Sequence, residues 1–345
     1  MMNDLIQTKC DLLADNRALI AKKYIFENNL MCIAAALIYT AADETADIEK
    51  LTESKKILKK HTGAFSKLRS ITELVLLCKM TLSDNPEEYP ERLKSVCATL
   101  KRAGFDNNSY LVQASMLICD LDAQDDSETI ASKAKEIMKR LNKAHPMLTS
   151  SEDVTSVILL AMSYKDADTV LSDLEAGYVY FTENYKLGLP KNSVQELCEI
   201  LAVTYGDMAS KCDTAARIYN CLRQRKAYFA KGTMFATLGL LTDTGLTPDE
   251  LAEEIMEAAE YLKGKDGFYN KENDEESEKR RMMYAALLIA CACGGDSDIV
   301  NSPAIGNAIS DITAKKIATA VTFTLNIAGS LIPALLGSES SESED

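Results

Sequence analysis

Clusters of lysine and arginine are the residues of this sequence best suited to bind a ligand. They recur near the carboxyl end of the second helix in successive predicted helical pairs, and stacking of these pairs would bring them to one edge. Such a basic edge could bind an acidic peptide, an anionic lipid head group or a nucleotide-like ligand. The alternative is that each cation only complements the negative end of its own helix. The candidate residues are Lys59, Lys60, Lys101, Arg102, Lys139, Arg140, Arg223, Arg225 and Lys226.

Nucleophilic catalysis would require a base beside the nucleophile, and the chain has only 2 histidines. His61 lies in a basic run, and His145 precedes Pro146 at the predicted end of a helix. A cation at a helix end suits the last carbonyl groups, so both positions favour a structural role. The sequence also lacks a phosphate-binding glycine loop. It therefore assigns no catalytic residue.

Aspartates gather in the predicted turns, and two groups of them have a spacing that could bind a metal ion or transfer a proton. The segment "DLDAQDDSETIA" at 120–131 begins like a calcium loop, but Asp125 stands where that loop needs glycine and Ala131 where it needs glutamate. Asp166 and Asp168 could form an acid–base pair, although aspartates in turns also cap the next helix. No C-x-x-C occurs, which disfavours zinc. We expect no metal site and no cofactor.

The elements that carry these residues repeat along the chain. Strongly apolar segments such as "ITELVLLCKM" recur about every 40 residues, the period of stacked helical hairpins. A polar turn such as "SDNPEEYP" follows, and then an amphipathic helix such as "ERLKSVCATLKRAGF". The apolar centres are Leu37, Leu76, Leu117, Leu159, Leu201, Leu240 and Leu287. The pattern predicts an all-α fold: a right-handed array of antiparallel helical hairpins, an α-solenoid that could close towards an α/α toroid.

Two segments give sharper local predictions. In "GLTPDELAEEIMEAAEYL", Thr247 is expected as the N-cap, Pro248 in the first turn, and Glu250 as the partner that completes a capping box. The polar stretch "KENDEESEKRRMMY" at 271–284 is expected to be a solvated loop before the last apolar repeat helix.

Composition limits the class and the partners of the protein. With 15 glycines and 7 prolines in 345 residues, the chain is poor in the turn residues of β proteins. A formal charge of −14 argues against nucleic acid as a partner. Most of the 10 cysteines lie inside apolar helical patterns, where they are expected as buried thiols. Together with the lack of a secretory start, they favour a reducing cytoplasm.

The uncharged segment 317–336 and the acidic "SESSESED" that follows raise the question of a membrane anchor. The segment has about the length that a spanning helix needs. As a helix, however, it would place a weakly polar stripe with Asn326 opposite an apolar stripe, which favours a helix that caps the array or self-associates. Membrane insertion is the alternative. The apolar stripe consists of Ile317, Val321, Leu325, Ile332 and Leu335.

Five segments resemble a bacterial family known as a domain of unknown function, DUF4003. They are "HTGAFSKLRS" at 61–70, "HPMLTSSEDVTSVILLAMS" at 145–163, "KGTMFATLGLL" at 231–241, "AEYLKGKDGFY" at 259–269 and "RRMMYAALLIA" at 280–290. The resemblance covers most of residues 20–290. It implies a cytoplasmic bacterial protein of helical hairpins and carries no activity with it.

These observations predict four regions: an N-terminal helical cap at 1–29, a hairpin array at 30–294, capping helices at 295–337 and a disordered acidic tail at 338–345. We expect a cytoplasmic scaffold or binding module with an unknown protein or peptide partner. Two alternatives stay open. One is an adaptor held at the cytoplasmic face of a membrane by the C-terminal helix, and the other is an enzyme with a carboxylate-lined cavity in an α/α toroid.

Overall fold

A computed structural model describes residues 2–63, 66–69, 72–145, 153–163, 165–185, 188–203, 206–227, 229 and 233–293. These residues form helices and turns, and no strand occurs among them. The all-α class predicted from the sequence is confirmed. The expected capping helices at 295–337, the candidate helix at 317–336 and the acidic tail at 338–345 lie outside the described residues.

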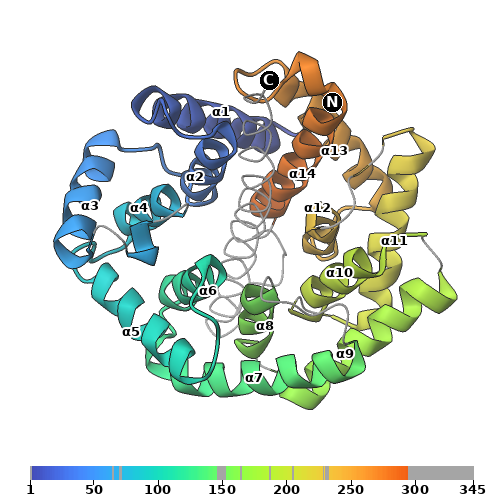
Figure 1. Cartoon of the computed structure of the whole chain (residues 1–345). Coiled ribbons are helices and arrows are strands. Elements are labelled where there is room, and N and C mark those ends of the chain that lie inside the picture. The colour runs from blue at the N-terminus through green and yellow to red at the C-terminus, as the bar shows by residue number, and fades with distance from the viewer. Residues whose placement is uncertain are drawn as a thin grey trace, which may run out of the picture.

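The helices lie in two layers around a common centre (Figure 1). The inner layer consists of α2 (Asn29–Ala41), α4 (Glu73–Leu82), α6 (Ser109–Asp120), α8 (Val154–Ala161), α10 (Lys191–Val203), α12 (Thr233–Ala236) with the 3-10 helix η5 (Thr237–Leu241), and α14 (Asp274–Cys293). The outer layer consists of α1 (Asp4–Lys23), α3 (Ile48–His61), α5 (Tyr89–Arg102), α7 (Ser127–Ala144), α9 (Ala167–Val179), α11 (Met208–Gln224) and α13 (Pro248–Lys263). The shorter elements are η1 (Lys67–Arg69), η2 (Gln124–Asp126), η6 (Lys271–Asn273) and the π-helix η4 (Tyr180–Asn184).

The division into layers follows from the distribution of apolar residues. In α6 every residue from 111 to 119 is buried, as expected for a helix enclosed on all sides. The outer helix α7 buries one stripe, in which Ile130, Ala134, Ile137 and Leu141 follow one another at 3–4 spacing. Its other faces carry lysine, arginine and glutamate and meet solvent. The apolar segments of the sequence therefore mark the inner helices.

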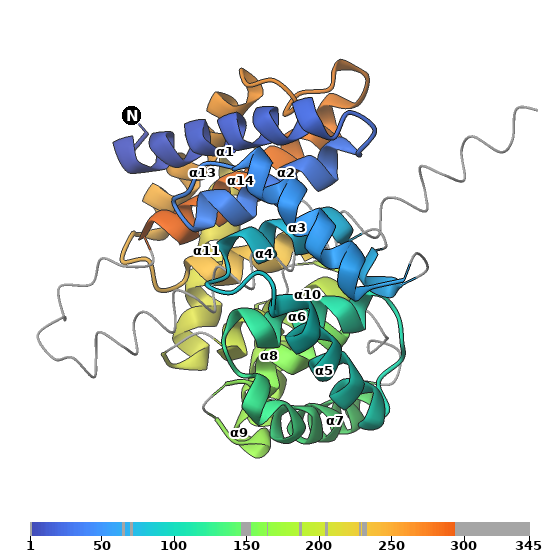
Figure 2. The ribbon, with the colours of Figure 1, turned by 90° about the vertical axis from the view of Figure 1, so that its left-hand side faces the viewer.

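The first helix meets the last two, so the ends of the described chain lie side by side (Figure 2). Asp11 of α1 accepts hydrogen bonds from Tyr261 of α13 at 2.8 Å and from Lys265 at 2.6 Å. Arg17 pairs with Asp266 at 2.6 Å, further along the same seam. Elsewhere each outer helix packs against the inner helix that follows it, as α5 does with α6 and α7 with α8.

The capping-box prediction for α13 is confirmed. The Thr247 hydroxyl accepts a hydrogen bond from the Glu250 N–H, and the Glu250 carboxylate accepts one from the Thr247 N–H at 2.8 Å. Pro248 occupies the first turn, where its missing N–H costs nothing. The sequence signal was strong here because capping depends on local spacing alone.

Two local predictions were wrong. The expected loop at 271–284 is largely helical, because η6 and then α14 begin within it and Asp274 and Glu275 suit the positive end of a helix. The inner element around Leu240 is not one α-helix but the short α12 continued by η5. At Gly239 a Cβ atom would lie 2.9 Å from Ile200, so this segment packs against α10 more closely than a side chain would permit.

Candidate functional site

A pocket of about 420 Å³ lies where three neighbouring inner helices end. Ala41 and Ala42 at the end of α2, Leu82 at the end of α4 and Leu121 after α6 contribute to its walls. Tyr89 in the first turn of α5 lines it as well. This volume is typical of small-ligand sites. We name this feature the α4–α6 pocket.

A tyrosine and an ion pair connect α4, α5 and α6 at the pocket. The Tyr89 side chain is buried, and its hydroxyl donates to Oδ1 of Asp120 at 2.7 Å. The other carboxylate oxygen of Asp120 accepts a hydrogen bond from Nζ of Lys79. Burial and the neighbouring Asp120 charge raise the pKa of Tyr89 well above its usual value, so its hydroxyl remains a donor.

Arg92 provides a second cation. Its Nη1 donates to Oδ1 of Asp122 at 3.3 Å and its Nη2 to the Ser83 hydroxyl at 3.1 Å. The guanidinium lies over the Tyr89 ring, 5.6 Å from the ring centre, in a cation–π contact. Its Nε atom is buried and makes no hydrogen bond within the described residues.

Carboxylates outnumber cations in the lining of the pocket. Its charged residues are Lys79, Asp84, Glu88, Arg92, Asp120 and Asp122. Each cation already has a carboxylate partner. Asp84 and Glu88 are exposed, and their side chains make no ion pair or hydrogen bond with the described part of the chain. The pocket therefore carries two carboxylates that its own cations do not neutralise.

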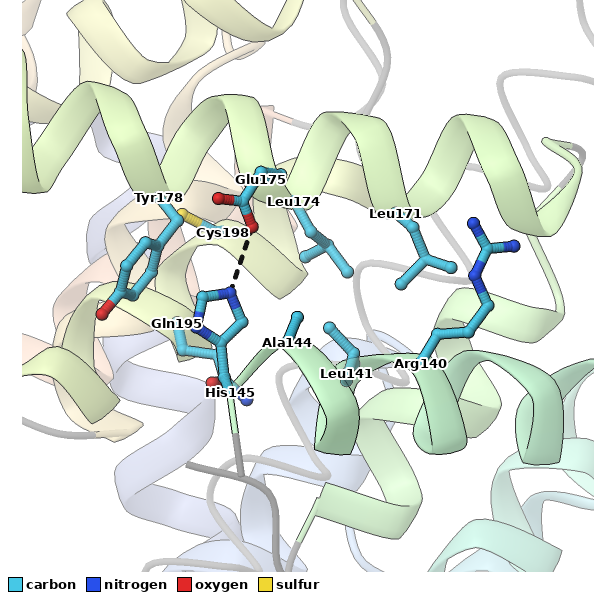
Figure 3. A pocket seen from close by; sticks show the side chains of 10 residues that line it. All are labelled: Arg140, Leu141, Ala144, His145, Leu171, Leu174, Glu175, Tyr178, Gln195 and Cys198. Atoms are coloured by element: carbon cyan, nitrogen blue, oxygen red, sulfur yellow. Dashed lines mark hydrogen bonds and ion pairs between the residues drawn. The ribbon is translucent and has the colours of Figure 1, made fainter. Parts of the chain in front are cut away.

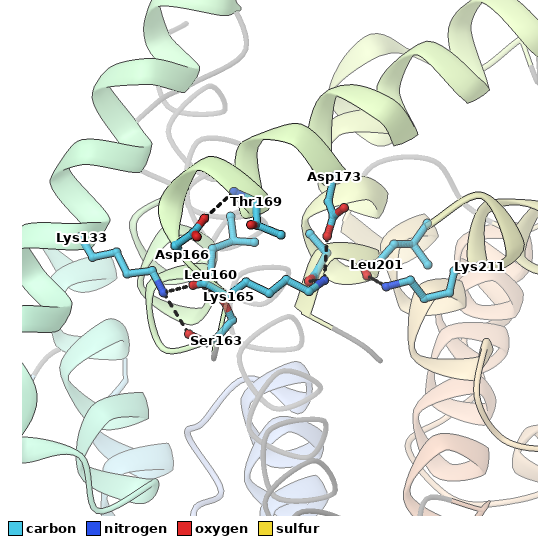
Figure 4. A network of polar contacts seen from close by, with 10 residues as sticks. Lys133, Leu160, Ser163, Lys165, Asp166, Thr169, Asp173, Leu201 and Lys211 are labelled. Atoms are coloured by element: carbon cyan, nitrogen blue, oxygen red, sulfur yellow. Dashed lines mark hydrogen bonds and ion pairs between the residues drawn. The ribbon is translucent and has the colours of Figure 1, made fainter. Parts of the chain in front are cut away.

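The carboxyl end of α8 is closed by a lysine from the outer layer (Figure 4). Nζ of Lys133 in α7 donates to the main-chain oxygens of Ser163 at 2.9 Å and Lys165 at 2.5 Å, both just beyond α8. Asp166 then caps α9 by accepting from the Thr169 N–H at 2.7 Å. An ammonium group thus satisfies two carbonyl groups of the turn that follows the helix.

Lysines close α10 and α2 in the same way. Nζ of Lys165 donates to the Ala202 carbonyl at 2.9 Å and pairs with Asp173 at 2.7 Å (Figure 4). Lys211 of α11 donates to the Leu201 carbonyl. At α2, Lys9 of α1 donates to the carbonyl of Thr40 at 3.0 Å. Burial and the nearby Lys165 lower the pKa of Lys211 to about 8.

A smaller pocket of about 170 Å³ lies between α7, α9 and α10 (Figure 3). Nε2 of His145 lies 3.1 Å from a carboxylate oxygen of Glu175, and the His145 ring packs 4.6 Å from that of Tyr178. Arg140 lines one end of this pocket and Cys198 another part. The histidine thus bridges two outer helices.

The predicted basic residues lie on the outer helices or directly after them, and several are engaged by the next outer helix. Arg102 pairs with Glu128 at 3.2 Å, Arg140 with Asp168 at 2.6 Å and Arg225 with Asp249 at 2.7 Å. Arg223 lies over the ring of Tyr219. The remaining candidates are exposed: Lys59, Lys60, Lys101, Lys139 and Lys226.

The pairs between outer helices weaken the basic edge as a continuous binding surface. A carboxylate opposite Arg102, Arg140 and Arg225 reduces the positive potential that an acidic ligand would meet. Asp168, considered above as half of an acid–base pair, is the partner of Arg140, and Asp166 is a helix cap. The structure does not bring the nine basic residues together in any of the pockets described here.

One buried carboxylate stands apart from these surface pairs. Glu199 of α10 is almost completely buried and accepts a hydrogen bond from Nε2 of Gln195 at 3.0 Å. Burial, followed by the charges of Asp153 and Glu196, raises the pKa of Glu199 to about 8. Sequence analysis did not single out this residue, because glutamate in an apolar helix gives no local signal of its pKa.

Seven of the ten cysteines are buried. Burial raises the pKa of Cys10, Cys119 and Cys212 to about 12, so these thiols are poor nucleophiles. Within the described ranges, no three His, Cys, Asp or Glu residues are grouped so that they could hold a metal ion.

Among the helices that the structure describes, none is both long enough and apolar enough to cross a membrane.

The residues of the α4–α6 pocket were not predicted as a site. The segments "SDNPEEYP" and "DLDAQDDSE" have the composition of interhelical turns, and both contain the turns that flank the pocket. The repeat period could have indicated that successive turns are neighbours. It could not indicate that Asp120 would turn inward to meet Tyr89 and Lys79.

The family described as "Protein of unknown function (DUF4003)" matches residues 17–301. No curated protein and no solved structure matches the chain. The matched range contains the described helices from α2 to α14, the last part of α1 and the whole α4–α6 pocket.

Proposed function

We propose that this chain, which belongs to the DUF4003 family, is a non-catalytic binding module. In this proposal the paired helices form a right-handed array that closes as an α/α toroid, and a protein or peptide partner docks where the inner helices end. The observation that supports the proposal is the α4–α6 pocket, which combines a ligand-sized volume with convergent polar groups. The nine basic residues would contribute only secondary contacts.

Peptide selection on the full-length chain tests this role. A displayed peptide library is selected on the wild-type protein, and enriched peptides are measured by calorimetry against a pocket-filling variant, Ala42→Trp. Ala42 is exposed and lines the pocket, so an indole fits there without entering the core. We expect peptides with micromolar affinity whose binding falls at least tenfold in the variant.

The matched control is Ser132→Trp, which adds the same side chain at an exposed position of α7 away from the pocket. It should leave peptide affinity unchanged. Selected peptides that bind both variants as well as wild type would refute the pocket as the docking site. Failure to enrich any peptide tighter than about 100 µM would refute the binding module itself.

An enzyme is a second candidate, supported by Glu199. A carboxyl group with a pKa of about 8 could act as a general acid at neutral pH. Chromogenic ester, phosphate and glycoside substrates would test this. Turnover that is lost in Glu199→Gln but kept in the exposed control Glu53→Gln would favour the enzyme, whereas no turnover favours the binding module.

We place the protein in the cytoplasm, with attachment to the cytoplasmic face of a membrane through residues 317–336 as the alternative. Carbonate extraction of membranes from cells that express the full chain separates the two. Recovery in the supernatant supports the cytoplasmic assignment, and retention in the pellet supports the membrane adaptor.

A further inference from the structure

The ends of the inner helices show which chemical group suits the α4–α6 pocket. At α8, α10 and α2, main-chain oxygens near the helix ends accept hydrogen bonds from primary ammonium groups of the protein. The donors are Lys133, Lys165, Lys211 and Lys9. The same local backbone arrangement, the carboxyl end of an inner helix followed by a polar turn, therefore binds an alkylammonium ion at three places in this chain.

The α4–α6 pocket contains the ends of α4 and α6, and also the end of α2, where Lys9 bonds to the Thr40 oxygen and leaves the Ala41 oxygen open. No hydrogen bond between described residues uses the main-chain oxygens of Ala41, Leu82 or Asp120. At Leu82 the reason is visible in the sequence, because Pro86 stands where an N–H could have reached back to this carbonyl. The negative ends of α2, α4 and α6 thus converge on one cavity.

The side chains add to this preference. Lys79 and Arg92 are the cations of the pocket, and Asp120 and Asp122 already pair with them. Asp84 and Glu88 line the same cavity without a partner among the described residues. An incoming cation would meet open carbonyl oxygens and two unneutralised carboxylates, whereas an incoming anion would compete with existing ion pairs.

We propose that the α4–α6 pocket binds a primary alkylammonium group, presented as a lysine side chain of the partner. This inference rests on the proposed binding function and names the chemistry of its ligand. Apolar lining by Ile38, Leu82 and Leu121 suits the methylene stem of lysine, while the helix ends and the two free carboxylates receive its ammonium. The external ammonium would take the place that Lys133 and Lys211 occupy at the ends of α8 and α10.

The test compares ligands that differ only in the terminal group. Calorimetry on the full chain would use Nα-acetyl-lysine methylamide, its Nε-acetylated form and the norleucine analogue, with 1,5-diaminopentane and glutarate alongside. We expect the lysine derivative to bind at least tenfold more tightly than either neutral analogue, and glutarate not to bind. Tighter binding of glutarate than of the lysine derivative would overturn the assignment of ligand class.

The variant Asp84→Asn with Glu88→Gln should weaken binding of the lysine derivative by about tenfold. The control Asp15→Asn with Glu53→Gln removes the same two charges from exposed sites on α1 and α3 and should not change it. If both variants lose affinity for the lysine derivative equally, the proposal is overturned, because the loss would then depend on the net charge of the protein and not on the pocket. Tighter binding of 1,5-diaminopentane than of the lysine derivative would support the ammonium site. It would also show that the ligand is a free amine and not a lysine side chain of a partner.

The outcomes separate this inference from the function on which it rests. Peptides that bind wild type and lose affinity in Ala42→Trp, but contain no required lysine, would leave the binding module intact and refute the ammonium site. If neither selected peptides nor the lysine derivative bind the wild-type protein, both proposals are refuted.

Discussion

The ends of α8 and α10 and the α4–α6 pocket are built alike but completed differently. At α8 and α10, lysines from the outer layer or the preceding turn bond to main-chain oxygens near the helix ends. At the α4–α6 pocket the outer helix α5 supplies Arg92 instead, which bonds to the side chains of Ser83 and Asp122. The guanidinium of Arg92 bonds to these side chains, and it donates no hydrogen bond to the main-chain oxygens at the ends of α4 and α6. The outer helix α5 thus carries an arginine beside the end of α4, whereas α7 and α11 carry lysines that close α8 and α10.

Closing a helix end with a buried lysine has an energetic cost. Lys211 is only 4% exposed, and its desolvation lowers its pKa to about 8, which means that its charged form is disfavoured. At the ends of α4 and α6 no described lysine bonds to a main-chain oxygen, so this cost does not arise there. The difference suggests that the closed ends serve stability while the open one is available for a ligand.

The largest effect is expected from breaking the ion pair of the open region. Asp120→Asn removes the charge that neutralises Lys79. The side chain of Asp120 is only 19% exposed and that of Lys79 only 11%. We expect a loss of about 2–3 kcal/mol in the free energy of unfolding, somewhat below the cost for a fully buried pair. Urea denaturation followed by circular dichroism measures it.

Asp122→Asn is the matched control for that change. Asp122 pairs with Arg92 but is 82% exposed and has a positive φ that asparagine also tolerates. Its loss should cost at most about 1 kcal/mol. Equal destabilisation by the two variants would contradict the view that burial at the pocket makes the Asp120 pair important.

An intermediate effect is expected at the closed end of α10, and it depends on pH. Lys211 has a pKa of about 8 in the folded protein, while a lysine in the unfolded chain has a pKa of about 10.4. Between these values the unfolded chain binds more protons, so this group makes stability rise with pH. In Lys211→Met that rise should disappear.

At pH 7 the variant Lys211→Met should differ from wild type by about 1 kcal/mol, because the lost hydrogen bond and the removed desolvation cost oppose each other. Unfolding curves from pH 7.5 to pH 10 provide the comparison. Tyrosines and cysteines that titrate in the same pH range are present in both proteins. The difference between the two free energies of unfolding therefore reports on Lys211. If the free energies of unfolding of the two proteins change in parallel with pH, burial does not lower the pKa of Lys211.

The smallest effect is expected on the outer surface. Arg102 and Glu128 are 66% and 81% exposed, so their ion pair is well solvated. Arg102→Gln should cost less than about 1 kcal/mol, and the cost should shrink in 1 M salt. Thermal unfolding at low and high salt tests this. A loss that is larger and independent of salt would indicate that the pairs between outer helices hold the array together.

The sequence was sufficient for features that depend on local spacing. Continuous apolar runs identified the inner helices, and Thr247 with Glu250 identified a capping box that the structure confirms. It was insufficient where packing between distant segments decides. Gly239 allows η5 to approach α10 closely, which no local pattern indicates.

The candidate site was less predictable than the fold. The basic residues were recognised by type, but their carboxylate partners lie 24 to 28 residues further on, as for Arg225 with Asp249 and Arg140 with Asp168. Whether a charged group is neutralised depends on the register between outer helices. In the same way, the pocket depends on which main-chain oxygens remain open when three helices end together.

Contact between α1 and the last two helices also limits how this chain can change in length. An open array can gain or lose a unit at either end, since the new terminal unit needs only one neighbour. Here Asp11 and Arg17 of the first helix bind Lys265 and Asp266 next to α13, so within the described residues the two ends of the array contact each other. In the closed array proposed above, duplication of one unit would have to force this seam apart. We therefore expect related chains to differ in their turns rather than in how many helical pairs they contain.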